Sequence, residues 1–174
     1  MSDGIRTRDR RDHNPELYQL SYAHQADSNL AGRAYSALRV AERNVDIVRS
    51  AVEAFNRGDV EAVLAVASEG IEVYSSRDLA NAGRFHGHQG FVQWTTQWLE
   101  AWDEFTVILV DVETLDDRHV LAIARQVGRG ALSGIEIDME VAQLFEIDRD
   151  GRIVRFQLHQ HREDALAEVG TGAG

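Results

Sequence analysis

Residues 105–161 read FTVILVDVETLDDRHVLAIARQVGRGALSGIEIDMEVAQLFEIDRDGRIVRFQLHQH, and this stretch decides the fold. Apolar and polar side chains alternate over four segments that polar turns separate, which is typical of half-buried β-strands. The predicted strands are Phe105–Leu115, His119–Val127, Ile135–Ile147 and Ile153–His161. Because short turns join strands that neighbour each other, the stretch predicts a long antiparallel meander.

Helical spacing marks the chain before this meander. A helix is predicted to begin at Asn44 or Asp46, either of which is a good cap, and to end at Gly58. The expected elements that follow are a short helix over 60–70, a strand over 71–75, a loop over 76–90, a helix over 90–102 and a terminal helix over 162–169. Helices first and strands afterwards predict an α+β fold, in which a curved antiparallel sheet wraps around the N-terminal helices like a cone.

The segment before Asn44 differs in character. Residues 1–43 are expected to be a disordered extension, because residues 1–30 are mostly polar, show no clear period and bury too little surface to offset chain entropy. Residues 4–20 also resemble the conceptual translation of a transfer-RNA gene, which implies that the true start lies near Val40. An ordinary disordered tail is the alternative. Residues 44–169 form the predicted domain, and residues 170–174 a flexible tail.

Composition narrows the classes of partner. The net charge is −11, and the chain after Asn44 holds 11 Arg against 23 Asp and Glu, so nucleic acid is not an expected partner. There is no cysteine, which excludes disulfides and thiolate metal sites. No apolar run approaches the roughly 20 residues of a membrane span, and no secretory signal is visible, so a soluble cytoplasmic protein is expected.

Strand alternation predicts which side chains face the helices. Val154, Phe156 and Leu158 form the apolar face of the last strand, and the opposite face, which carries Gln157 and His159, is expected to meet solvent or a second subunit. Gln143 is a polar exception on the inward face of the preceding strand. On the third helix, Trp94, Trp98 and Trp102 recur at intervals of four, which is typical of core packing.

Residues 44–169 resemble the SnoaL-like branch of the nuclear transport factor 2-like superfamily. The resemblance is carried by Ile47-Val48, Phe55-Asn56-Arg57-Gly58-Asp59, Phe85-His86-Gly87-His88-Gln89-Gly90-Phe91, Arg125-Gln126-Val127-Gly128-Arg129-Gly130, Ser133-Gly134, Asp150-Gly151-Arg152-Ile153-Val154 and Arg162-Glu163-Asp164-Ala165-Leu166. It implies a cone-shaped sheet closed by helices, an apolar pocket, and a homodimer through the sheet. Relatives include ketosteroid isomerase, limonene epoxide hydrolase, scytalone dehydratase and polyketide cyclases, so the fold does not fix the function.

The resemblance also implies what the pocket holds and lacks. Its expected lining is Phe55, Val73, Ser75, Trp98, Gln126, Met139, Gln143 and Leu158. Where limonene epoxide hydrolase has its Tyr, Asn, Arg and two Asp, this chain has Val73, Ser75, Ala124, Gln126 and Leu158. Where ketosteroid isomerase has its Asp and Tyr, this chain has Ser75 and Ala51. Neither set of catalytic groups is matched, so neither activity is expected to transfer.

Histidines are the remaining candidates for catalysis. His86 and His88 lie in the predicted loop at the mouth of the pocket, and imidazole is suited to proton transfer near neutral pH. Together with His159 and His161 they also supply ligands for a divalent cation, yet roles in shaping the loop and the polar face of the sheet are favoured. We therefore expect no metal and no cofactor.

Three functions remain open at this point. The first is a non-catalytic domain that binds a small apolar or aromatic metabolite, which the missing carboxylates favour. The second is an isomerase, cyclase or dehydratase that uses a pocket histidine. The third is a dimerising interaction module whose pocket is filled by side chains.

Overall fold

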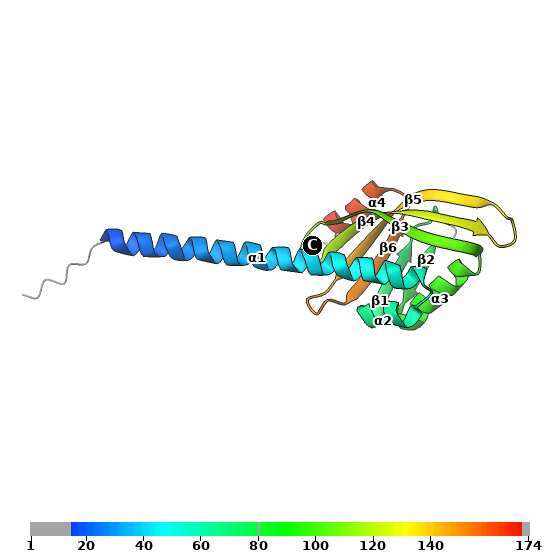
Figure 1. Ribbon diagram of the computed structural model, residues 1–174, viewed down its shortest axis with the longest axis horizontal. Coiled ribbons are helices and arrows are strands. Elements are labelled where there is room, and N and C mark those ends of the chain that lie inside the picture. Colours follow the sequence, from blue (N-terminus) through cyan, green and yellow to red (C-terminus); the bar gives the residue numbers. More distant parts are fainter. Residues whose placement is uncertain (1–14, 80, 172–174) are drawn as a thin grey trace, which may run out of the picture. The chain divides into compact units, whose positions relative to one another are not determined.

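The computed structural model describes residues 15–79 and 81–171 of the 174 (Figure 1). The chain divides into two compact units, Met1–Leu38 and Arg39–Gly174. All six strands of the described residues lie in the second unit. The elements in chain order are α1 (Pro15–Asn56), α2 (Val60–Val66), β1 (Ala67–Ser75), β2 (Gly83–His86), α3 (Gly87–Leu99), β3 (Trp102–Thr114), β4 (His119–Gly130), β5 (Glu136–Ile147), β6 (Ile153–His159) and α4 (Arg162–Thr171).

The strands form one curved sheet in the order β2-β1-β6-β5-β4-β3. Strands β3 to β6 make the predicted antiparallel meander, and β1 pairs antiparallel with β2. The predicted α+β fold class is confirmed, with one difference in detail. Strand β1 pairs with β6 in parallel. The two strands are far apart in the sequence, since β2, α3 and the first three strands of the meander lie between them. The sheet is therefore mixed rather than wholly antiparallel.

The start of β1 was predicted wrongly, and β2 was not predicted. Strand β1 begins at Ala67 instead of Ile71, since Ala67–Gly70 carries almost no apolar signal and its pairing with β6 is irregular. Strand β2 lies inside the predicted loop, where Phe85 is its one apolar side chain. Helix α3 then begins at Gly87, which has a positive φ of 71°.

The start of α1 also differs from the prediction. The helix begins at Pro15, a residue suited to a first helical position, so the described part of the predicted disordered extension, residues 15–43, is helical. Residues 29–39 are exposed, although Leu30, Ala34 and Leu38 recur at helical spacing. Asn44 caps no helix: it is fully buried, and its Nδ2 donates to the carbonyl oxygen of Asp117 at 3.1 Å. Residues 1–14 lie outside the described residues, and the origin proposed for residues 4–20 stays a prediction.

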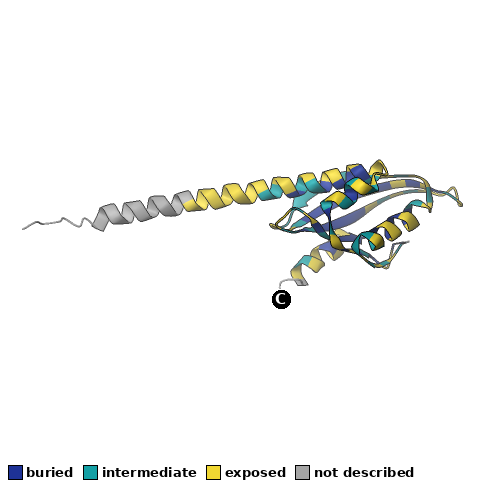
Figure 2. Ribbon diagram, turned by 90° about the horizontal axis from the view of Figure 1, so that it is seen from below, coloured by how far each residue is buried: buried dark blue, intermediate teal, exposed yellow. Residues whose placement is uncertain are grey.

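Helices cover both faces of the sheet. Val141 and Phe145 of β5 belong to the main core, to which α1 contributes Val48 and α3 contributes Trp94. The intervening residues of β5 point the other way, and there Leu144 packs against Ala165 of α4. Figure 2 shows buried residues on the strands and on the helix faces that meet them. Each fully buried valine or leucine side chain stabilises the fold by about 1.5–3 kcal/mol.

The helix on the second face changes the environment of β6. The face that carries Gln157 and His159 was predicted to meet solvent or a second subunit, but both side chains are buried. Helix α4 contacts β4, β5 and β6 on that face. The terminal helix was predicted from sequence, yet its packing side was not, because Ala165 and Val169 give it only a weak apolar stripe.

Asn56 at the end of α1 is bonded to the edge strand β3. Its Nδ2 donates to the carbonyl oxygen of Val107 at 2.8 Å, and its Oδ1 accepts from the backbone N–H of Val107 at 2.9 Å. An edge strand otherwise leaves such groups unpaired. The side chain of Asn56 therefore fixes the helix against the sheet at the point where the core opens into a cavity.

Candidate functional site

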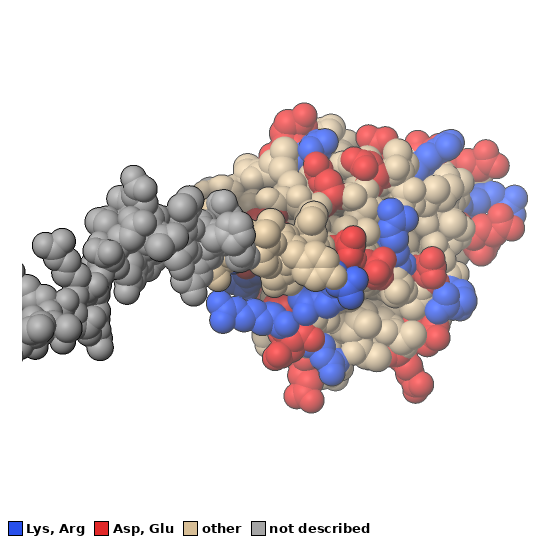
Figure 3. All heavy atoms as spheres, turned by 60° about the vertical axis from the view of Figure 1, so that its left-hand side comes forward, with Lys and Arg blue, Asp and Glu red and all other residues tan. Residues whose placement is uncertain are grey.

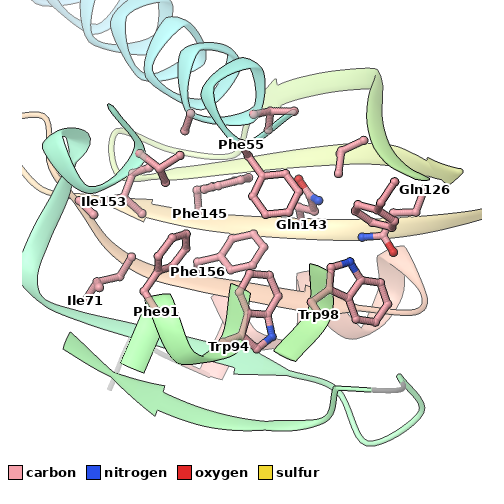
Figure 4. A pocket seen from close by; sticks show the side chains of 16 residues that line it. Phe55, Ile71, Phe91, Trp94, Trp98, Gln126, Gln143, Phe145, Ile153 and Phe156 are labelled. Atoms are coloured by element: carbon pink, nitrogen blue, oxygen red, sulfur yellow. The ribbon is translucent and has the colours of Figure 1, made fainter. Parts of the chain in front are cut away.

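A small apolar cavity lies between α1, α3 and the inner face of the sheet, with a volume of about 60 Å³ (Figure 4). Sixteen residues line it: Ala51, Val52, Phe55, Val63, Ala67, Ile71, Phe91, Trp94, Trp98, Phe105, Val107, Gln126, Gln143, Phe145, Ile153 and Phe156. Among these described residues none is titratable. The site is thus built from hydrocarbon, aromatic rings and two carboxamides.

The spacing of these residues along helices and strands determines that their side chains face the cavity. On α3, Trp94 and Trp98 are one turn apart and both point to the sheet. On β5, Gln143 and Phe145 are two residues apart and so share the inner face. Trp102 departs from the predicted stripe, because α3 ends at Leu99 and Trp102 opens β3, where its ring stacks near that of Phe105 at 6.0 Å.

Aromatic rings form two connected groups around the cavity. At one end, the ring of Phe105 meets Trp98 edge-on at 5.3 Å and Phe55 edge-on at 6.2 Å. At the other, Phe156 lies 5.5 Å from Trp94 and 5.0 Å from Phe145. Edge-to-face contacts at these distances are favourable, so the rings hold one another in place.

The two carboxamides are the polar exceptions in this lining. Gln126 of β4 is 3% exposed and Gln143 of β5 is 4% exposed. Within the part of the chain that the structure describes, the Oε1 atom of each has no hydrogen-bond partner. Trp94 Nε1 is likewise buried and without a partner among the described residues. The carboxamides of Gln126 and Gln143 therefore supply polar groups to a lining that is otherwise mostly hydrocarbon and aromatic, and each holds an unpaired acceptor among the described residues.

Four of the eight pocket residues predicted from sequence line this cavity: Phe55, Trp98, Gln126 and Gln143. The other four lie elsewhere. Val73 and Leu158 are buried in the main core, Met139 is partly buried against it, and Ser75 Oγ donates to Asn81 Oδ1 at 3.0 Å. All eight belong to the inner side of the sheet, but the second group does not line the cavity.

Several lining residues were not singled out from the sequence. Trp94 was placed on the stripe of the third helix, and Phe156 on the inner face of its strand, but only as core. The signal was present in the strand alternation and in the i, i+4 spacing. It does not reveal where a core is left partly empty, because that depends on how side chains from different elements fit together.

The histidines lie outside the cavity. His86 is exposed immediately before α3, and the Nε2 of His88 is 3.4 Å from the carbonyl oxygen of Ala67. His159 lies on the opposite face of the sheet, where its Nε2 is 3.0 Å from Gln157 Oε1. Burial there lowers the pKa of His159, against the opposing charges of Glu168 and Asp164. In residues 15–79 and 81–171, no three His, Asp or Glu side chains gather as a metal site would require.

No helix among the described residues is both long enough and apolar enough to cross a bilayer.

The sequence was compared with the models of known protein families. The model of the SnoaL-like domain matches residues 48–156, which is most of the unit that holds the sheet and the cavity. The chain belongs to the SnoaL-like domain family. A comparison with curated proteins finds no match. The fold and the family therefore agree with the resemblance seen in the sequence.

Solved structures give the same fold at low sequence identity. Bal32a, from a soil-derived mobile gene cassette, is 24% identical, covers 74% of this chain and 97% of its own, and has a TM-score of 0.63. TerC, co-crystallised with polyporic acid, is 15% identical over 72% of this chain and 96% of its own, with a TM-score of 0.61. A protein from Xanthomonas campestris pv. campestris that is proposed to be a polyketide cyclase is 23% identical over 75% and 98%, with a TM-score of 0.57.

Proposed function

We propose that this SnoaL-like domain binds a small apolar or aromatic molecule in the cavity between α1, α3 and the sheet, without acid–base catalysis. The observation that carries the proposal is the lining itself. Its sixteen described residues are hydrophobic or aromatic except for two glutamines, and none of them titrates. General acid–base catalysis needs a titratable group within reach of the proton that moves. An apolar hollow with a few polar groups is instead the usual form of a small-molecule site.

The volume of the cavity limits its occupant. Engineered cavities of about 150 Å³ take up benzene, and ligand pockets are usually about 300–1,000 Å³, whereas this cavity measures about 60 Å³. An aromatic ligand therefore enters only if a lining side chain moves. Phe55 is the suitable one, because it is only partly buried, lies at the last turn of α1 and contacts Phe105 by its edge.

The relatives support a small-molecule site of this kind. TerC was crystallised with polyporic acid, and the Xanthomonas campestris protein is proposed to act as a polyketide cyclase. Both share the fold and not a close sequence, so the identity of the ligand does not transfer. What supports the present assignment is the apolar lining of this chain.

Catalysis by a pocket histidine is the alternative enzyme hypothesis. His86 is exposed and His88 sits against the backbone of Ala67, and neither belongs to the lining of the cavity. The positions at which the resemblance implies carboxylates hold Gln126, Leu158 and Ser75 here. Binding without catalysis accounts for these residues better.

A homodimer through the outer face of the sheet is a second proposal, and a separate observation favours it. Ile108, Val110 and Val127 are exposed on β3 and β4, beyond the part of that face against which α4 packs. Clustered apolar side chains of this kind are typical of subunit contacts. This dimer is compatible with ligand binding on the other side of the sheet.

A thermal-shift titration with p-xylene, p-cresol and indole tests the binding function. A ligand that binds only the folded state raises the midpoint of unfolding, and the shift grows with ligand concentration. We expect a saturable rise with at least one probe. In the variant Ala51→Leu, a larger side chain fills the cavity from α1, so the rise should disappear while the domain stays folded.

The matched control is Ala65→Leu, which adds the same side chain on the exposed side of α2. This variant should keep the full ligand-dependent shift. If no probe shifts the wild-type midpoint up to its solubility limit, or if Ala51→Leu binds as well as the wild type, the cavity is not the binding site.

A further inference from the structure

Gln126 and Gln143 are placed where packing alone gives no reason for a carboxamide. Both side chains lie on the inner face of the sheet, more than nine-tenths buried, among Phe, Trp, Val and Ala side chains. A leucine of similar length would bury the same area without a polar atom to satisfy. A buried amide without a partner loses its hydrogen bonds to water and gains nothing in return, so it destabilises the fold unless something in the cavity bonds to it.

The two carboxamides lie at different places along the cavity (Figure 4). Gln126 pairs with Met139 on β5, and Gln143 is four residues further along that strand, which corresponds to roughly 13 Å between the backbone positions. In the close-up view, Gln126 lies near Trp98, and the carboxamide of Gln143 lies beside the ring of Phe55. The lining therefore holds two polar points among aromatic rings.

The chemistry of these two points selects the ligand. A carboxamide offers an N–H donor and a carbonyl acceptor, and in both residues the acceptor Oε1 is unpaired among the described residues. A carboxylate ligand would have no cation in the lining to pair with, and a pure hydrocarbon would leave both acceptors unsatisfied. A hydroxyl group donates to Oε1 and also accepts from an amide N–H, so it matches either glutamine.

Building on the proposed function, we infer that the ligand is a small ring compound with hydroxyl groups, and that Gln126 and Gln143 are the residues that select it. The rings of the lining bind the apolar body of the ligand. The two carboxamides distinguish a hydroxylated compound from a hydrocarbon of the same shape. A site built to bond a hydroxyl group rejects the analogue that lacks it, because its own polar atoms then stay unpaired.

A series of isosteric probes tests this inference on the full chain. In p-xylene, p-cresol and hydroquinone, methyl groups are replaced one after another by hydroxyl groups of nearly the same size. Calorimetric titration of the wild type should give p-cresol an affinity roughly tenfold higher than that of p-xylene, the value expected for one added hydrogen bond in a buried site. Hydroquinone should bind at least as tightly as p-cresol.

The variants Gln126→Leu and Gln143→Leu assign the effect to its residues. At least one of them should lose roughly tenfold in affinity for p-cresol and hydroquinone and keep the wild-type affinity for p-xylene. Each should also unfold at the same temperature as the wild type or higher, because an unpaired polar group has been removed. A merely structural glutamine would give the opposite result, a lower midpoint with no change in the order of the probes.

Gln157→Leu is the matched control. This glutamine is also buried in the sheet, but it faces the side covered by α4, and its Oε1 is bonded to His159. Its loss should lower the midpoint of unfolding and leave the affinities for all three probes unchanged. If p-xylene binds as well as p-cresol, the cavity is a purely apolar site and the inference fails while the proposed function stands. If none of the probes binds, the proposed function fails and the inference with it.

Discussion

His159 links the stability of the domain to pH. Its side chain is 3% exposed under α4, close to the ring of Tyr74 and bonded to Gln157. Burial lowers the pKa of His159, and the negative charges of Glu168 and Asp164 only partly oppose that effect. The folded state therefore holds this imidazole neutral at a pH at which an exposed histidine already begins to take up a proton.

The sign of the resulting pH dependence is fixed by linkage. Below the ordinary histidine pKa of about 6.5, the unfolded chain binds a proton at residue 159 more readily than the folded chain does. The contribution of His159 is thus present above about pH 6.5 and is lost as the pH falls through its lower folded-state pKa. Urea unfolding of the wild type at about pH 7.5 and about pH 5 should give a lower free energy of unfolding at the acidic pH.

The variant His159→Gln should show a smaller loss between those two pH values, since it has no imidazole to protonate. His161→Gln, which replaces an exposed histidine two residues further on, should keep the wild-type pH dependence. Equal pH dependence in the wild type and in His159→Gln would show that protonation of this residue is not coupled to unfolding.

At the residue scale, strand alternation predicts well which face of the sheet a side chain lies on. It predicts less well which other residues that side chain contacts. It placed Gln143 and Phe156 on the inner face, and both line the cavity. It placed Leu158 on the same face, yet Leu158 is covered by core neighbours. For His159 it gave the correct face and the wrong environment, because burial under α4 depends on a helix that packs from another part of the chain.

At the element scale, the junction between α1 and β3 shapes one end of the cavity. Asn56 bonds both backbone groups of Val107, and Phe55 and Val107 both line the cavity. In Asn56→Ala, the N–H and the carbonyl of Val107 lose these partners. We expect a loss of about 1–3 kcal/mol in the free energy of unfolding, measured by urea denaturation. Affinity for cavity probes should weaken as well, because α1 is no longer fixed beside β3.

Glu53→Ala is the control for this experiment. It removes an exposed side chain from the same turn region of α1 and should change the free energy of unfolding by less than about 0.5 kcal/mol. A comparably small effect of Asn56→Ala would mean that water replaces the amide at the edge of β3 and that the helix needs no such bond.

The predicted elements differ in how well local sequence defines them. The meander of β3 to β6 follows from long alternating segments and polar turns. The four residues of β2 and the first residues of β1 are extended because β1 pairs with both β2 and β6. Pairing between separate segments leaves no periodic pattern in the local sequence. Residues 29–39 of α1 are helical and exposed, so burial of an apolar face does not explain why this part of the chain forms a helix.

At the scale of the whole molecule, surface charge and exposed apolar side chains affect which partners the protein can bind. Acidic and basic side chains are intermixed on the face seen in Figure 3, and the net charge of −11 opposes binding to a phosphate backbone. On the outer face of the sheet, Ile108 is 46% exposed and Val127 is 36% exposed. Arg125 and Asp138 form an ion pair between exposed side chains on the same face. An apolar strip with paired charges is suited to a two-fold contact between identical sheets.

The proposed dimer predicts the effect of one charge in that strip. Ile108 lies directly opposite Arg125 on β4, so the glutamate of Ile108→Glu has a basic neighbour within its own sheet and the fold should tolerate it. In a two-fold contact the substitution is present in both subunits, so two added carboxylates lose water when the apolar strips of the two sheets meet. We expect sedimentation velocity to find the wild type as a dimer and Ile108→Glu as a monomer with an unchanged midpoint of unfolding. Val92→Glu, which alters an exposed apolar side chain on α3, should remain dimeric. A monomeric wild type, or dissociation by both substitutions alike, would remove the outer face of the sheet as the subunit contact.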